Sequence, residues 1–216
     1  KLGHTGILMF WVFLLTIPIA LTIGVLAGMR EGTKTDRSLS IFAIFTTSVP
    51  PYVSGILFTI LFSSWLGILK GVAKAGNITF ANFALPVLTI VAYDIGYIAR
   101  MTRASMVEVM GSQYIRTARL KGMPFLAVVL KHALRNALIA PFTVIMLQFP
   151  WLLTGVVIVE KLFNYKGFGF LLVSAADQND IDVTLACGVV AVVLVLTTQL
   201  ISDIGYVFLN PRIRFS

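Results

Sequence analysis

Long runs without any charged residue constrain this sequence more than any other feature. No Asp, Glu, Lys or Arg occurs at positions 5–29, 38–69 or 136–159, and most residues there are apolar. A helix needs about 20 mostly apolar residues to cross the roughly 30 Å hydrocarbon core of a bilayer. Only 12% of the 216 residues are charged, about half the share usual in soluble domains. The sequence therefore excludes a soluble enzyme, a secreted disulfide scaffold and a disordered chain.

Five segments qualify as membrane spans, which predicts an all-α, polytopic helical membrane protein. They cover about 5–29, part of 38–69, about 84–99, 136–159 and about 183–209. Four of them contain proline, which membrane helices tolerate because neighbouring helices can satisfy the freed carbonyl groups. The single cysteine, Cys187, lies in the fifth segment and cannot form an internal disulfide.

Basic residues are distributed unevenly between the two ends of these spans. The connections after the first and third spans, together with the tail after the fifth, hold 12 of the 17 Lys and Arg residues, including all nine arginines. By the positive-inside rule this side is cytoplasmic, so the net charge of +8 reflects topology and does not call for nucleic acid as a partner. We therefore expect a cytoplasmic C-terminus and an external N-terminus. An external N-terminus directly before a span indicates a chain without its first span, and a genuine five-span protein is the alternative.

The connection at 100–135 carries seven of the basic residues and has its own helical pattern. Positions 112–121 contain no helix breaker, while Gly122 and then Pro124 supply a stop signal. Arg116 and Arg119 share one face of this helix, and Ile115 and Ala118 share an adjacent apolar face. Such a helix suits docking into a groove on a partner protein. It equally suits a position on anionic lipid headgroups.

Several stretches of this sequence resemble permeases of one transporter family. YIRTARLKG at 114–122, followed by HALRNAL at 132–138, resembles the cytoplasmic loop of dipeptide/oligopeptide ABC-importer permeases. These carry an "EAA" motif with a glycine four residues after its last alanine, and Arg116, Thr117, Ala118 and Gly122 stand at that spacing. Arg and Thr replace the Glu and first Ala, as they often do in the peptide branch. Positions 24–37, 160–169 and 210–214 resemble the family's first cytoplasmic turn, last outer loop and C-terminus.

The resemblance implies a MetI-like ABC-importer transmembrane domain over residues 1–216, with six spans when complete. It implies a multi-pass subunit of the bacterial inner membrane that contacts lipid, pairs with a second permease, homologous or identical, and works with two ATPase subunits and an extracytoplasmic solute-binding protein. No GxxxxGK[ST] phosphate loop occurs in the sequence, so ATP would be bound by the partner ATPases. We expect no cofactor, no metal site and no enzymatic activity in this chain.

Within that family, the helix near 112–122 would be the coupling helix, part of a cytoplasmic coupling loop at 100–135. ATPase closure would push this helix and tilt the spans between inward-open and outward-open states. Gly122 would allow the turn that ends the helix, and Ala118 would permit close approach of the ATPase. The full set of residues expected to couple to the ATPase is Tyr114, Arg116, Thr117, Ala118, Arg119, Lys121 and Gly122.

Asp94 is the one acid well inside a predicted span, which makes it a candidate for the translocation pathway. There it could meet the amino group of a peptide-like solute, with Tyr97 and Gln148 as further pathway candidates. The alternative is a hydrogen bond between helices. An ion-coupled secondary transporter using Asp94 is the main rival function, although the inverted repeats typical of that class are not evident. An intramembrane enzyme would need paired acids or a His/Glu cluster within the spans, and the sequence has neither.

Overall fold

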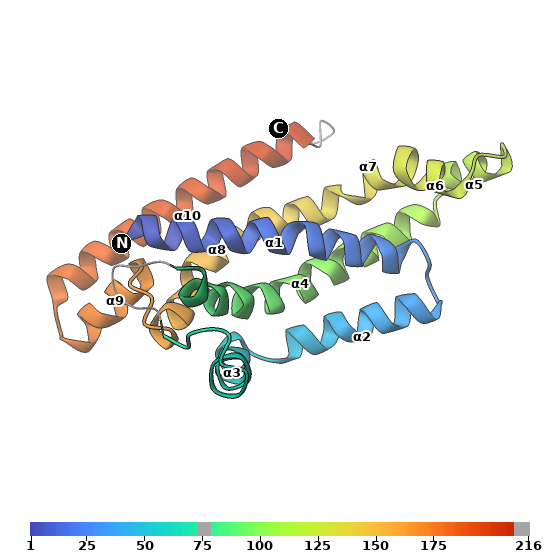
Figure 1. The fold of residues 1–216 in the computed structure, drawn as a ribbon. Coiled ribbons are helices and arrows are strands. Elements are labelled where there is room, and N and C mark those ends of the chain that lie inside the picture. Colours follow the sequence, from blue (N-terminus) through green and yellow to red (C-terminus); the bar gives the residue numbers. More distant parts are fainter. Residues whose placement is uncertain (73–78, 210–216) are drawn as a thin grey trace. The chain divides into compact units, whose positions relative to one another are not determined.

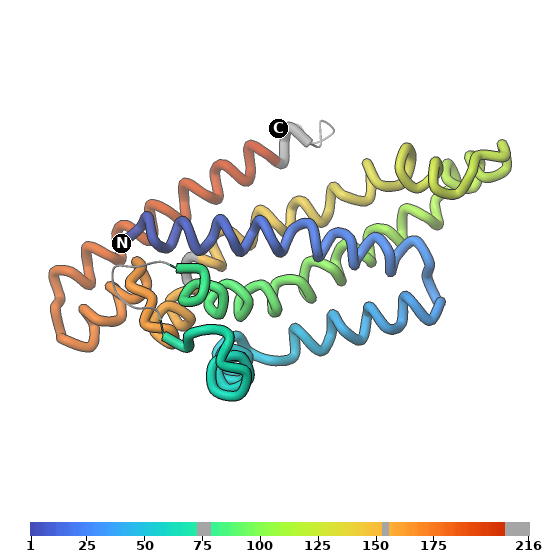
Figure 2. Tube along the Cα trace, in the orientation of Figure 1, coloured from blue at the N-terminus to red at the C-terminus, as the bar shows by residue number. Residues whose placement is uncertain are grey.

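A computed structural model describes residues 1–72 and 79–209 of the chain, without the side chains of 153–155 and 206–209. Figure 1 shows its helices as a ribbon, and Figure 2 traces the same path through the Cα atoms. No β-strand occurs among the described residues, which confirms the predicted all-α class. The basic residues Lys74, Arg212 and Arg214, and the family-like stretch at 210–214, lie outside the described residues.

Within 1–72 and 79–209, three helices are long and apolar enough to cross a membrane alone. They are α1 (Leu2–Gly28), α4 (Phe80–Met110) and α10 (Ile181–Leu209), which correspond to the first, third and fifth predicted spans. The helix α4 is much longer than the predicted span at 84–99. Its last 11 residues, 100–110, were expected to begin the cytoplasmic loop.

The second predicted span is broken into α2 (Lys34–Ser48), α3 (Pro51–Phe58) and the π-helical segment η1 (Thr59–Trp65). The break falls at Val49 and Pro50 because proline disfavours helical conformation in the residue before it and donates no backbone hydrogen bond. Pro50 is extended, with φ −58° and ψ 146°, and Pro51 opens α3. The second predicted span is thus a bent pair of helices.

The fourth predicted span also begins earlier than the charge pattern indicates. A helical run starts with α6 (Phe125–Val128), continues through the π-helical segment η2 (Val129–Ala133) and α7 (Leu134–Ala137), and leads into α8 (Ile139–Leu162). Counting each bent pair as one span gives up to five candidate spans. The short helices α5 (Gln113–Leu120) and α9 (Phe168–Asp177) complete the fold.

The chain forms two compact units. The first unit consists of Lys1–Leu15, Val49–Tyr93 and Leu147–Ile201. It includes α3, η1 and α9, and aromatic stacking of Phe13 on Phe149 and of Tyr93 on Trp151 contributes to its packing. The second unit consists of Thr16–Ser48, Asp94–Met146 and Ser202–Ser216, of which 210–216 are not described. It includes α2 and the helices α5 to α7.

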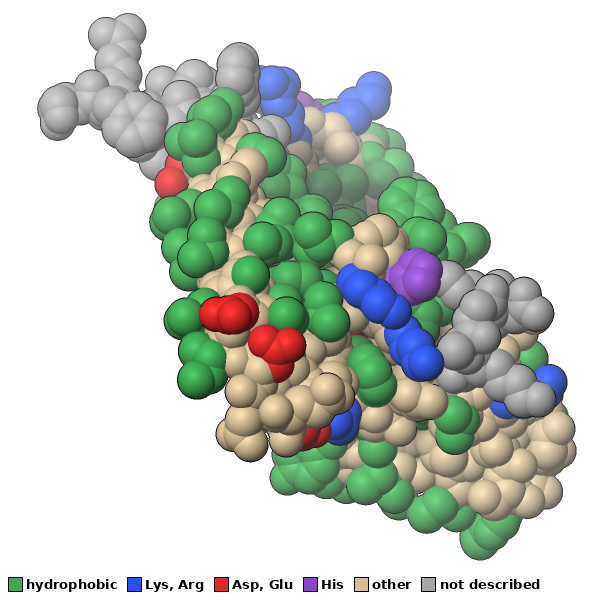
Figure 3. All heavy atoms as spheres, turned by 90° about the vertical axis from the view of Figure 1, so that its left-hand side faces the viewer, with side chains coloured by type: hydrophobic (Ala, Val, Ile, Leu, Met, Phe, Trp, Pro, Cys, Tyr) green, Lys and Arg blue, Asp and Glu red, His purple; other side chains and the backbone are tan. Residues whose placement is uncertain are grey.

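Most of the described surface of α10 is apolar, although Asp182 and Asp203 near its two ends are exposed. Leu185, Val189, Val193, Leu196 and Leu200 are all exposed. Figure 3 shows one face of the molecule on which hydrophobic side chains cover much of the described surface and charged side chains form only a few groups. Exposed apolar patches of this extent mark contact with lipid or protein, as expected for a membrane-spanning chain.

Candidate functional site

The helix α5 (Gln113–Leu120) confirms the helix predicted at 112–121 and its stop at Gly122. Gly122 has φ +78°, a left-handed conformation that glycine adopts without strain. The Gly122 N–H bonds to the Arg119 carbonyl, and the Met123 N–H bonds to the Ala118 carbonyl at 3.3 Å. This is the Schellman pattern, which satisfies the last carbonyl groups of a helix. No heavy atom lies within 4 Å of a Cβ built at position 122, so backbone conformation alone calls for glycine there.

One face of α5 is fixed to the neighbouring helices by apolar packing. Ile115 is 0% exposed and Ala118 is buried beside it. They belong to a hydrophobic cluster that brings together α4, α5 and the helical run 125–137, and its remaining members are Met106, Val128, Val129, Ala133 and Ala137. The close approach of an ATPase at Ala118 stays a prediction, and in this structure the Ala118 methyl group packs inside the second unit.

The opposite face of α5 is open to solvent and basic. Arg116, Thr117 and Lys121 are exposed, and the Arg119 guanidinium lies 5.6 Å from the centre of the Phe125 ring. A cation at that distance from an aromatic face is attracted by the ring. The Tyr114 hydroxyl accepts a hydrogen bond from the Asn136 side-chain amide at 2.9 Å. Tyr114 thus ties the start of α5 to the end of the 125–137 run.

Exposed leucines next to this basic face were missed by the sequence analysis. Leu120 is 81% exposed, and Leu126 and Leu130 are also exposed. Leu126 and Leu130 stand four positions apart, so they share a helix face. Large apolar side chains inside a polar rim are typical of the centres of protein interfaces. The sequence spacing could have indicated the exposure of Leu120, because Leu120 falls outside the helix face that Ile115 and Ala118 define.

The charge of this region is of one sign. Positions 111–135 hold five basic residues and no Asp or Glu. We name this surface the α5 surface, and its exposed members are Tyr114, Arg116, Thr117, Arg119, Leu120, Lys121, Leu126, Leu130, Lys131 and Arg135. A partner of complementary chemistry would present acidic residues around an apolar groove.

The three pathway candidates lie on two long helices. Asp94, on α4 in the second unit, is 1% exposed, and Gln148, on α8 in the first unit, is also buried. Tyr97, three positions after Asp94, is exposed. Tyr93 stacks on Trp151 with ring centres 5.4 Å apart, which gives it a packing role. Asp94 and Gln148 both make polar or electrostatic contacts within the chain, so burial alone does not separate a pathway role from a structural one.

Residues 160–169, expected to resemble a last outer loop, form a hydrogen-bonded site around Glu160. This side chain is 0% exposed and directly follows the uncharged stretch 136–159. Its carboxylate accepts hydrogen bonds from the Thr5 hydroxyl and, at 2.9 Å, from the Phe170 N–H. Thr5 in turn accepts from the Phe168 N–H at 2.8 Å. Burial raises the pKa of Glu160 above its ordinary range, opposed by these hydrogen bonds.

Two neighbouring residues strengthen the same site. The Tyr165 hydroxyl donates to the His4 carbonyl at 2.8 Å, and burial together with the charge of Glu160 raises the pKa of Tyr165 to about 12. The His4 ring nitrogen Nδ1 lies 3.1 Å from the Lys166 carbonyl oxygen. These contacts fasten the start of α1 to the loop between α8 and α9. No local pattern in the sequence indicates this pairing, because its partners are more than 150 residues apart.

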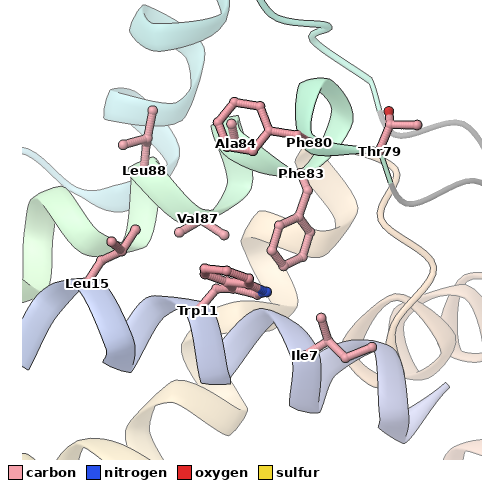
Figure 4. A pocket seen from close by; sticks show the side chains of 9 residues that line it. All are labelled: Ile7, Trp11, Leu15, Thr79, Phe80, Phe83, Ala84, Val87 and Leu88. Carbon is pink, nitrogen blue, oxygen red and sulfur yellow. The ribbon is translucent and has the colours of Figure 1, made fainter.

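An apolar cavity of about 410 Å³ also lies in the first unit, between α1 and α4. Figure 4 shows Trp11 and Phe83 pointing toward one another across it. Its full lining is Ile7, Trp11, Leu15, Thr79, Phe80, Phe83, Ala84, Val87 and Leu88. A polar solute there would lose its hydration and find few hydrogen-bonding partners. We therefore do not assign this cavity to a polar transported solute.

The long apolar helices define the chain as a helical membrane protein, and a fold comparison identifies its architecture. The inward-facing MetNI methionine ABC transporter contains a chain that superposes with a TM-score of 0.72 at 18% identity, covering 96% of this chain and 92% of that one. This likeness shows a MetI-like permease fold. Residues 20–215 match the family model described as "Binding-protein-dependent transport system inner membrane component". The chain belongs to this family of ABC-transporter permeases.

Curated relatives agree with this membership. The oligopeptide transport system permease protein AppB of Bacillus subtilis is 33% identical, over 100% of this chain and 70% of its own length. The glutathione transport system permease protein GsiC of Salmonella typhimurium is 37% identical, over 96% of this chain and 65% of its own length. The chain thus spans about two thirds of the length of these relatives.

Proposed function

We propose that this chain is the membrane-spanning permease subunit of an ATP-driven importer that moves di- or oligopeptides, or a related small solute, by alternating access. Family membership supports the permease role, and the names of AppB and GsiC support a peptide-like solute. The chain itself would have no enzymatic activity. Its partners would be a second permease subunit, two ATPase subunits that bind ATP, an extracytoplasmic solute-binding protein and the lipid of the inner membrane.

The α5 surface is the observation that carries this proposal. A permease without its own phosphate loop must receive work through a protein contact, and this contact must be firmly joined to the spans. The α5 helix meets both needs, because one face packs on Met106 of α4 while the other exposes basic residues and leucines. We propose α5 as the coupling helix within a coupling region at 100–135. Tyr114, Arg116, Thr117, Arg119, Lys121 and Gly122 would form or hold the docking face.

The proposed topology places the α5 surface and the C-terminus in the cytoplasm. Its support is the charge distribution, in which 12 of 17 basic residues fall on one side of the predicted spans. The first unit contains the opposite connections, among them the Glu160 loop and α9. This end would face the solute-binding protein.

The coupling role is tested with Arg116→Ala and Gly122→Ala in the complete transporter, reconstituted in proteoliposomes. We expect ATP hydrolysis to continue while uptake per ATP falls at least fivefold, about 1 kcal/mol of lost coupling. Arg30→Ala removes an exposed arginine elsewhere in the second unit. Gly67→Ala places alanine at another positive-φ glycine, φ +63°, with open space around it. Both controls should behave as wild type, and unchanged coupling in both test variants would refute the proposed role.

A pathway role for Asp94, Tyr97 and Gln148 is a separate part of the proposal. If Asp94 meets a cationic group of the solute, Asp94→Asn will lower uptake of peptide-like solutes at limiting concentration. The variant should retain wild-type assembly with the other subunits, because Asn preserves the side-chain volume. Uptake that is insensitive to Asp94→Asn at both limiting and saturating solute would leave the helix-to-helix hydrogen bond as its role. Membership of this family does not favour the ion-coupled alternative.

A further inference from the structure

A partly buried ion pair joins α2 to α4 in the second unit, with Asp36 buried and the Arg103 side chain 31% exposed. The Arg103 guanidinium donates through Nε and Nη2 to the two carboxylate oxygens of Asp36, at 2.5 and 2.8 Å. Asp36 is only 4% exposed and also accepts hydrogen bonds from the Gly32 N–H and the Ser40 hydroxyl. A two-point contact of this kind fixes the relative orientation of both side chains. Asp36 thus holds the start of α2 and the turn before it against α4.

Three glycines let α1 and α2 come close to the backbone of α4. A Cβ at Gly24 or Gly28 of α1 would overlap α4, at Thr102 and Ala99 in the first case and at Met106 and Arg103 in the second. A Cβ at Gly96 of α4 would likewise overlap Ala43 and Thr46 of α2. Small residues permit such close approach, and helix association in lipid depends on this packing. The second-unit parts of α1 and α2 therefore approach the backbone of α4 too closely for a larger residue at these three positions.

The same stretch of α4 carries the α5 helix. Met106 lies three positions after Arg103, so the two share a helix face. Met106 contacts the site of Gly28 and also belongs to the cluster with Ile115 and Ala118. Val25 and Met29 of α1 pack against this cluster as well. A continuous set of contacts thus leads from α5 through Met106 to α1, and through Arg103 to Asp36 and α2.

We propose that Asp36 and Arg103 form a positioning pair that makes α2 move together with α4 when the α5 surface is pushed. The inference rests on the proposed coupling function and extends it to a specific route of transmission. Apolar and glycine contacts resist approach of the helices, but they resist sliding poorly. The two-point ion pair supplies the missing constraint, because sliding would separate the buried Asp36 carboxylate from its cationic partner and break both hydrogen bonds between them. Without the ion pair, α4 should move relative to α2 when the α5 surface is pushed.

The test uses Asp36→Asn and Arg103→Lys in the complete transporter in proteoliposomes. Asp36→Asn removes the charge with little change of shape. Arg103→Lys keeps the positive charge and loses the planar two-point contact. Arg37→Gln is the matched control, since Arg37 neighbours Asp36 but is exposed. Two quantities are measured: uptake per ATP hydrolysed, and the distance distribution between spin labels at Ser38→Cys on α2 and Ala104→Cys on α4, with and without ATP.

We expect uptake per ATP to fall about tenfold in Asp36→Asn and about threefold in Arg103→Lys, with a broader label distance distribution in both. Arg37→Gln should match wild type in both measurements. A wild-type ratio, or a lowered ratio with an unchanged distance distribution, would overturn the positioning role. If Asp36→Asn does not assemble, Arg103→Lys decides alone.

The variants of α5 separate this inference from the coupling function. If Gly122→Ala uncouples transport while both pair variants do not, the positioning role fails and the coupling function stands. If Gly122→Ala and Arg116→Ala leave coupling unchanged, the coupling function itself fails.

Discussion

Gly167 is predicted to be the residue on which the Glu160 site most depends. A Cβ built at position 167 would overlap both carboxylate oxygens of Glu160 and the carbon between them. These atoms form the head of a fully buried side chain that lies among hydrogen-bond donors, so the carboxylate cannot move without breaking contacts. Gly167→Ala therefore tests whether the packing around Glu160 stabilises the first unit.

The magnitude follows from the contacts that the displaced carboxylate would lose. The Thr5 hydroxyl and the Phe170 N–H both donate to it, and each hydrogen bond to a charged group contributes about 1.5–3 kcal/mol. Losing one or both gives a destabilisation of about 2–5 kcal/mol. For a chain of this length, 1 kcal/mol corresponds to about 2–4 °C in Tm. We therefore expect Gly167→Ala to lower the Tm by roughly 4–20 °C.

The chain supplies its own reporter for this measurement. Cys187 is its single cysteine and is buried, so a thiol-reactive fluorogenic dye will react only on unfolding. Gly6→Ala, in the same unit, is the matched control because no heavy atom lies within 4 Å of a Cβ there. It should change the Tm by no more than about 2–4 °C, since alanine for glycine in a helix is worth about 1 kcal/mol. Equal Tm values for the two variants would refute the steric reasoning.

Three further predictions concern other parts of the chain. Burial raises the pKa of Glu160, so the folded state binds a proton on this carboxyl group more tightly than the unfolded chain does. The contribution of Glu160 to stability therefore falls as the pH rises above about 4.3. The Tm difference between wild type and Glu160→Gln should accordingly grow in favour of wild type as the pH is lowered from about 7 toward about 5. Leu120→Glu should weaken ATPase binding at least tenfold, about 1.4 kcal/mol, with unchanged Tm, whereas Gln113→Glu, which adds the same charge to α5, should weaken binding less; equal losses would indicate that charge alone matters. Gly96→Ala should lower the Tm by several degrees because its Cβ would overlap α2, and a Tm equal to that of Gly188→Ala, which has open space, would contradict this packing.

The helix α5 was predictable because its determinants are local. Gly122 ends it through a backbone conformation, and Ile115 and Ala118 mark its buried face by spacing alone. The same pattern could not say what covers that face. The answer is Met106 and the helical run 125–137 of the same chain.

The ends of the spans were less predictable, for a different reason. Charged residues mark where a helix leaves lipid, whereas a helix ends where its backbone hydrogen bonding stops. Arg100 is therefore a poor marker of the helix end, since α4 continues to Met110. Pro50 and Pro51 were visible within a long apolar stretch, but their effect depends on whether neighbouring helices satisfy the freed carbonyl groups. Contacts such as Asp36 with Arg103, 67 positions apart, carry no local signal.

The residues that contact one another around Glu160 are synthesised at very different times. Thr5 and Phe168 are 163 residues apart, and ribosomes add about 5–20 residues per second. The helix α1 therefore emerges from the ribosome roughly ten to thirty seconds before Phe168 and its neighbours, which hold the start of α1 in the folded chain. During that interval the start of α1 can be held only by helices synthesised before Phe168 or by insertion factors, and membrane proteases can reach it. Substitutions at Thr5, Glu160 or Gly167 should thus reduce the amount of protein that accumulates in the cell, separately from any effect on transport by the molecules that mature.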